Sequence, residues 1–179
     1  MENKLSYRKQ KQASLYEMKT VGYYLMSLFQ FWKKMNFSQE VLSKLIYEEY
    51  HNFSKTRLPF NWYEHILEKL ELTTDDLLIE VAKVDLNHDH DLHYHKLSHA
   101  ICIILGEQEG FFNCGYGQII KDKETIRTFN GLEVYFPSYC KHTFNAPYST
   151  VTGSLYFLSI QSPPLLTEER DDFYFINKL

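Results

Sequence analysis

The chain has 179 residues, of which 44% are hydrophobic and 23% are charged, and its formal net charge at pH 7 is −4. This length suits one domain or a compact domain with a helical extension, and 14 Tyr and 13 Phe residues supply ample apolar area for a core. A weakly acidic chain without a long basic run argues against nucleic acid as a partner.

The cysteines and the first residues bear on the compartment. Three cysteines at irregular spacing are too few for a disulfide framework and suit a reducing environment. Residues 1–19 are polar and charged, without the apolar centre of a secretory signal. No apolar stretch approaches the roughly 18 residues that suggest a membrane span. We therefore expect a cytoplasmic protein without a membrane partner.

Apolar residues recur at helical spacing from about Ser14 to Leu72. A stripe that begins at Tyr24 predicts one helix, Ser38 is the expected N-cap of a second, and Asn61 that of a third. Aromatic stripes of this kind usually face a core. We expect residues 1–73 to form a helical N-terminal segment that packs on the rest of the protein or on a second subunit.

The pattern changes after Asp75 to short segments that are rich in β-branched and aromatic residues. Turn signals such as GEQEG and FNGLE separate these segments at close intervals. No helical pattern of ten or more residues intervenes between them. The sequence therefore predicts a mostly β protein in which residues 74–179 form an antiparallel sandwich or barrel.

Five of the eight histidines lie between residues 88 and 99. On a strand, His93 and His95 point to the same face, and two imidazoles that face the interior would aim at one metal ion. Two ligands rarely hold a metal, so a third must come from elsewhere. His99 would lie about 13 Å from His95 on an unbroken strand and joins only if the chain bends, so it is a third ligand, a supporting residue or a histidine of the core. His142 is the histidine that remains beyond this group.

The stretch around His93 and His95 resembles the first of the two sequence motifs of the cupin superfamily. In that motif, a His-x-His pair precedes an acidic residue and a later glycine. His93 and His95 match the pair, and Gly106 stands at the later glycine. His99 stands where the acidic residue is expected. The likeness implies a cupin-type antiparallel β-barrel, or jelly roll.

The second motif is similar to the cupin pattern of a glycine, a proline, a histidine and an asparagine. Gly131, Pro137, His142 and Asn145 follow this order, while Tyr139 stands where a further glycine is expected. Both motifs in order are fairly specific for the superfamily. Tyr139 is expected to line the wall that contacts a substrate.

A narrower resemblance links the stretch HYHKLSH, residues 93–99, to the thiol dioxygenases. It continues in SLYFLSIQSPP, residues 154–164, which is similar to their Ser-x-His-x-Tyr stretch. This family oxidises a thiol to a sulfinate with O2 at a ferrous ion. The resemblance implies that His93, His95 and His142 bind iron(II), with His99 as a supporting catalytic group.

The chain departs from this family at two places. Tyr156 and Leu158 replace the histidine and tyrosine of the downstream stretch, so the proton relay is missing or rebuilt. Tyr156 is either a core aromatic residue or, if the strand is regular, faces the pocket, where its phenol would donate a proton or hold bound oxygen. The arginine that holds a substrate carboxylate has no clear counterpart, and Arg57 and Arg127 are the candidates.

Three neutral imidazoles leave the charge of a divalent ion uncompensated, which favours an anionic thiolate and leaves positions open for O2. The leading hypothesis is an iron(II) dioxygenase that acts on a small thiol. The alternatives are another metal-dependent cupin enzyme, such as a lyase, isomerase or carbon-bond dioxygenase, and a non-enzymatic cupin that binds metal or a small ligand. Nickel, zinc and manganese remain alternatives to iron, and a homodimer is left open.

Overall fold

The computed structural model describes residues 10–34, 66–73, 75–84, 92–105, 117–145, 155–164, 166–167 and 170–176. The helix predicted to begin at Ser38 and the candidate substrate residue Arg57 lie outside these ranges. The division of the chain near residue 73 stays a prediction.

Helix α1 (Leu15–Lys34) begins with a reciprocal cap. The backbone N–H of Glu17 donates to Ser14 Oγ at 3.2 Å, and the backbone N–H of Ser14 donates to Glu17 Oε2 at 2.7 Å. This capping box satisfies two backbone donors that the first helical turn leaves without a partner. Within the described ranges, no helix is both long and apolar enough to span a membrane.

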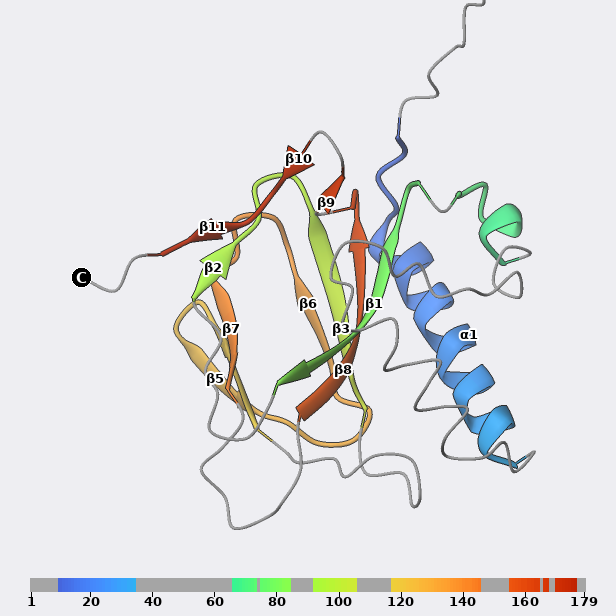
Figure 1. Cartoon of the computed structure of the whole chain (residues 1–179), viewed down its shortest axis with the longest axis horizontal. Coiled ribbons are helices and arrows are strands. Elements are labelled where there is room, and N and C mark those ends of the chain that lie inside the picture. Colours follow the sequence, from blue (N-terminus) through green and yellow to red (C-terminus); the bar gives the residue numbers. More distant parts are fainter. Residues whose placement is uncertain are drawn as a thin grey trace, which may run out of the picture.

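The strands form two antiparallel sheets (Figure 1). The four-stranded sheet has the order β1 (Leu78–Val84), β8 (Leu155–Ser162), β3 (His99–Leu105) and β6 (Glu133–Phe136). The five-stranded sheet has the order β11 (Tyr174–Phe175), β2 (His93–Tyr94), β7 (His142–Asn145), β4 (Gln118–Lys121) and β5 (Glu124–Arg127). Strands β9 (Leu166–Thr167) and β10 (Arg170–Asp171) form a separate pair.

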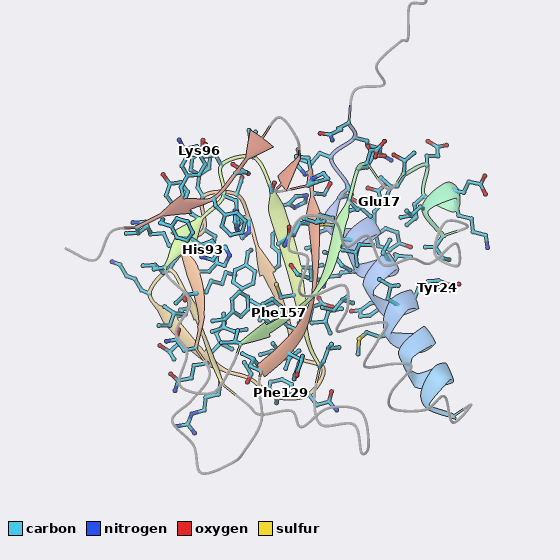
Figure 2. All side chains as sticks on the ribbon, in the orientation of Figure 1. Glu17, Tyr24, His93, Lys96, Phe129 and Phe157 are labelled. Carbon is cyan, nitrogen blue, oxygen red and sulfur yellow. The ribbon has the colours of Figure 1, made fainter. Side chains whose placement is uncertain are left out.

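The prediction of a mostly β protein with antiparallel sheets is confirmed. The expected closure into a barrel is not seen among the described residues, because no strand of one sheet pairs with a strand of the other. The two sheets instead face each other across a shared core. Phe144 of the five-stranded sheet and Phe157 of the four-stranded sheet stack between them, with ring centroids 4.1 Å apart. Figure 2 labels Phe157 on its strand.

Strands β3 and β8 are buried on both faces and so separate two hydrophobic clusters. The inner cluster lies between the sheets and includes Ile104, Phe136, Phe144 and Phe157. The outer cluster lies between the four-stranded sheet and α1, and includes Met18, Val21, Leu25, Ile101, Ile103, Leu158 and Ile160. Successive side chains of a strand alternate between these clusters, so one residue of offset decides which environment a side chain enters.

Candidate metal site

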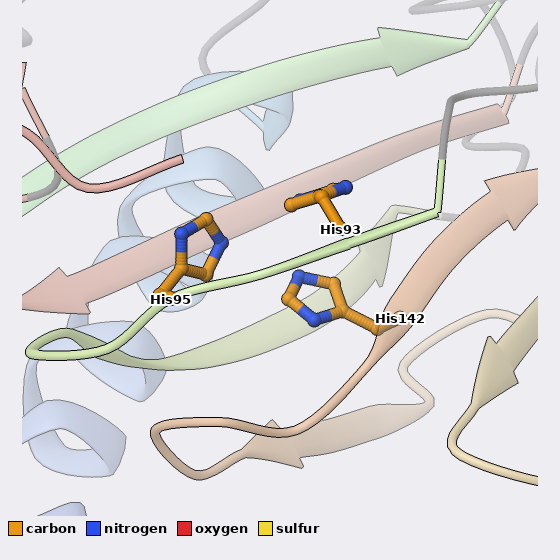
Figure 3. A group of neighbouring side chains, drawn as sticks. All are labelled: His93, His95 and His142. Carbon is orange, nitrogen blue, oxygen red and sulfur yellow. The ribbon is translucent and has the colours of Figure 1, made fainter. Parts of the chain in front are cut away.

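Strand pairing brings three histidines together at one end of the five-stranded sheet. His93 on β2 is the direct antiparallel partner of His142 on β7, and His95, two residues after His93, directly follows the end of β2. The ring centroids of His93 and His142 lie 4.4 Å apart, and those of His95 and His142 lie 5.1 Å apart. Figure 3 shows the three rings pointing toward one another.

One potential ligand nitrogen from each of these rings lies within 4.8 Å of the other two. All three side chains are buried, with exposed fractions between 4% and 7%. A zinc–nitrogen bond measures about 2.0–2.1 Å. A small inward movement of the rings would therefore bring all three nitrogens within bonding distance of one ion. We call His93, His95 and His142 the histidine trio.

Backbone carbonyls fix the orientation of two of these rings. His95 Nδ1 lies 2.8 Å from the carbonyl oxygen of Asp172, and His142 Nδ1 lies 3.0 Å from that of Cys140. A carbonyl oxygen only accepts hydrogen bonds, so each Nδ1 carries the proton and donates it. In the neutral form of both rings the nitrogen without a proton is therefore Nε2, and this is the atom that each ring offers to a metal.

The surroundings also keep His142 neutral. Burial lowers its pKa most, His93 lowers it further, and the Cys140 carbonyl raises it only partly, so the pKa is about 3. A neutral imidazole is the form that binds a metal, since protonation removes the lone pair. Phe136 stacks on the His142 ring with centroids 4.4 Å apart, so one face of this imidazole is covered by an apolar side chain.

His99 lies apart from the trio. It begins β3 on the face that carries Ile101 and Ile103, toward α1. Its Nε2 donates to the carbonyl oxygen of Ala13 at 2.7 Å, and its Nδ1 accepts from the Tyr135 hydroxyl at 3.0 Å. Burial lowers the pKa of His99. The structure therefore gives this side chain contacts with the N-terminal segment, and it is not a member of the group that converges on one point.

Tyr156 also lies on the α1 side of its sheet. It belongs to the outer cluster against α1, whereas its neighbour Phe157 faces the space between the sheets. Strand β8 is buried on both faces, and Tyr156 lies on the α1 side, where it packs as a core aromatic residue; its catalytic role stays a prediction. The catalytic roles predicted for Tyr156 and His99 remain without support from their positions.

Tyr139 and Arg127 lie at the surface. Tyr139 is 63% exposed, has a left-handed backbone with φ of 64°, and stacks on Tyr94 with centroids 6.2 Å apart. Its backbone N–H donates to the carbonyl oxygen of His95, so the turn supports the trio even though the ring faces outward. Arg127 is exposed at the end of β5, and β7 and β4 separate that strand from β2. Their predicted contacts with a substrate stay predictions.

The C-terminal residues, which carry no sequence motif, contribute Asp172 and Phe173 to this site. The Phe173 ring lies against His95 with centroids 4.7 Å apart, and against His93 at 5.1 Å. Burial raises the pKa of Asp172, but hydrogen bonds from three backbone N–H groups lower it below the ordinary value. No local pattern marks these residues, because their partners lie 74 to 80 residues away.

No known family model matches the chain, and no match was found among curated proteins. Solved structures that it resembles include a cupin-2 domain protein from Rhodospirillum rubrum, at 19% identity and a TM-score of 0.45, over 59% of this chain and 60% of that one. KdgF from Halomonas sp. matches at 19% identity and a TM-score of 0.42, over 51% of this chain and 73% of that one. The DMSP lyase DddQ from Ruegeria pomeroyi matches at 19% identity and a TM-score of 0.42, over 52% of this chain and 42% of that one.

Proposed function

We propose that this protein is a mononuclear metal-dependent enzyme whose ion is held by His93, His95 and His142. The observation that carries the proposal is the convergence of three buried imidazoles, two of which have Nδ1 engaged by a backbone carbonyl. Such preorganised neutral ligands suit iron, nickel, zinc or copper. The sequence resemblance to cupin motifs supports the same residues.

The leading reaction is the oxygenation of a small thiol, with iron(II) as the ion. A bound iron(II) ion would supply redox chemistry and an uncompensated positive charge that attracts a thiolate. The overall conversion is R–SH plus O2 to R–SO2H, so both oxygen atoms are transferred to sulfur and no separate reductant is consumed. The chain supplies neutral ligands, so the thiolate is the anion that balances the charge.

The residues around the trio would exclude water from such a reaction. Phe136 packs on His142, Phe173 on His95, and Phe144 and Phe157 fill the space between the sheets. An apolar environment strengthens the attraction between a cationic centre and an anionic substrate. In His95 and His142, the carbonyls that accept from Nδ1 keep the proton on that nitrogen, so Nε2 can bind the metal.

One observation favours a second candidate, a metal-dependent lyase, isomerase or carbon-bond dioxygenase, or a cupin that only binds its ligand. His99 and Tyr156 face α1, so the side chains expected to move protons in a thiol dioxygenase lie on the other side of the sheet. Nickel, zinc or manganese would suit these alternatives equally well.

Metal content tests the site. Protein purified without a histidine tag is loaded anaerobically with iron(II), passed over a desalting column and measured by inductively coupled plasma mass spectrometry. We expect near one equivalent in the wild type and less than a tenth in His142→Ala. The matched control is His99→Ala, which also removes a buried histidine and is expected to retain the ion. Equal retention in all three proteins would contradict the proposed site.

Oxygen consumption tests the reaction. The iron-loaded protein is mixed with small thiols that carry or lack a carboxylate, in an oxygen electrode, and the product is identified by mass spectrometry. We expect thiol-dependent uptake of one O2 per sulfinate formed, lost in His142→Ala and retained in part in His99→Ala. Binding of metal without thiol-dependent uptake would favour the second candidate.

A further inference from the structure

We propose that Asp172 and Phe173, which we call the C-terminal brace, are positioning residues that set the tautomer and orientation of His95. This inference rests on the proposed metal site and extends it to residues that do not bind the ion. The brace enters the site from the far end of the chain, just before β11 pairs with β2.

The Asp172 carboxylate holds the turn that follows His95. Its Oδ1 accepts from the backbone N–H of Lys96 at 3.0 Å, and its Oδ2 accepts from those of Leu97 and Ser98 at 3.0 and 2.8 Å. Hydrogen bonds to an ionised acceptor are stronger than neutral ones, and Asp172 is only 1% exposed. The carboxylate thus fixes the chain where it leaves β2 and turns toward β3.

The same residue contacts the His95 ring through its backbone. The Asp172 carbonyl accepts from His95 Nδ1 at 2.8 Å, so one residue holds both the ring and the turn beside it. A free imidazole in water carries its proton mainly on Nε2, which would block the nitrogen needed for a metal. The carbonyl selects the opposite tautomer, and partners of this kind typically change metal affinity by about 10- to 100-fold.

Phe173 restricts the His95 ring from a second direction. The two rings meet edge to face, with an interplanar angle of 87° and centroids 4.7 Å apart. The same phenyl ring lies 5.1 Å from the His93 ring, so it limits the rotation of both imidazoles of the pair. Phe173 thereby covers His93 and His95 with an apolar ring, as Phe136 covers His142.

Nuclear magnetic resonance of the metal-free protein tests the brace directly. Long-range proton–nitrogen spectra report which ring nitrogen is protonated, and a His95→Gln spectrum assigns the signals. We expect His95 to carry its proton on Nδ1 in the wild type. Asp172→Asn keeps the backbone carbonyl but weakens the hold of the side chain on the turn beside it, so we expect part of the His95 population to shift toward the Nε2–H form. An Asp172→Asn protein that folds and keeps the wild-type tautomer would overturn the role of Asp172.

Cobalt(II) binding tests the consequence for the site, through affinity and the visible spectrum. We expect Asp172→Asn and Phe173→Ala to bind cobalt about 10- to 100-fold more weakly, with shifted absorption bands. The matched control is Asp76→Asn, since Asp76 is equally buried and accepts from the backbone N–H groups of Lys11 and Thr73, far from the trio in sequence. Asp76→Asn is expected to lower the melting temperature while leaving affinity and spectrum unchanged.

The outcomes separate the two proposals. A wild type that binds no metal contradicts the proposed function, and the tautomer measurement then still decides whether the brace orients His95. A wild type that binds cobalt together with unchanged affinity and spectrum in both brace variants overturns the brace alone. If Asp172→Asn fails to fold, Phe173→Ala decides the question, because it leaves every hydrogen bond of Asp172 in place.

Discussion

The histidine rings of this protein differ in which nitrogen a backbone carbonyl engages. In His95 and His142 the carbonyl accepts from Nδ1, which leaves Nε2 without a proton. In His99 the carbonyl of Ala13 accepts from Nε2, and Nδ1 is then used by the Tyr135 hydroxyl. Residues of one type therefore serve two purposes. Only the first arrangement leaves a nitrogen that a metal can reach.

The burial of His99 predicts a pH dependence of stability. Burial lowers its pKa in the folded state, while the unfolded chain keeps a value near 6.5. The unfolded state therefore binds more protons, so this contribution to stability is complete above the unfolded pKa and is lost as the pH falls toward the folded pKa. We expect the urea midpoint to fall from pH 7.5 to pH 5.5, and to fall less in His99→Gln, which stays neutral.

The difference between the two proteins isolates His99, because any other titrating histidine is common to both. Glutamine also keeps a donor for the Ala13 carbonyl, so the variant loses the titration while retaining a hydrogen bond. An identical fall of the urea midpoint in wild type and His99→Gln would show that His99 does not titrate in this range.

At the scale of elements, the contact of α1 with the four-stranded sheet depends on a small residue. A Cβ atom on Gly22 would lie 2.8 Å from Ile103 Cδ1 and 3.1 Å from Ile160 Cδ1, so the helix backbone packs directly on the ends of these side chains. The helix also reaches β6, where the Tyr23 hydroxyl donates to Glu133 at 2.8 Å. Burial of the helix face and this polar contact together fix the position of α1.

This packing predicts that Gly22→Leu destabilises the protein. Alanine would be accommodated by movement of two flexible isoleucine ends, but leucine would need space for three further carbons against the sheet. Overpacking of this kind costs about 1–3 kcal/mol, more than the helix propensity that is gained. Urea unfolding measures the change, with Ser27→Leu on the exposed side of α1 as the control. Equal stability of both variants would contradict close packing at Gly22.

At the scale of the whole molecule, the features that depend on neighbouring residues could be predicted from the sequence, whereas those that depend on long-range contacts could not. The alternation of strand side chains placed His93 and His95 on one face, because two residues that are two positions apart in an extended chain point the same way. The segment AICIIL after His99 is apolar on both faces, so no alternation could assign His99 or, on β8, Tyr156 to a side. Asp172 was missed because no short pattern records a partner 77 residues away.

A metal that binds only the folded state should stabilise the whole molecule. The two hydrophobic clusters do not include the histidine trio, so we expect the metal-free protein to remain folded. At a free metal concentration 100 times Kd, binding adds about 2.7 kcal/mol. At about 2–4 °C per kcal/mol for a chain of this size, the melting temperature should rise by roughly 5–10 °C.

Calorimetry with and without a chelator measures this rise. His142→Ala should melt at the same temperature under both conditions, because the third ligand is missing, whereas His99→Ala should melt lower than the wild type yet keep the full shift. The two variants thus separate binding at the trio from general stability. A shift in His142→Ala as large as in the wild type would place the ion elsewhere. Unfolding of the wild type on chelation would show that the clusters alone do not hold the two sheets together.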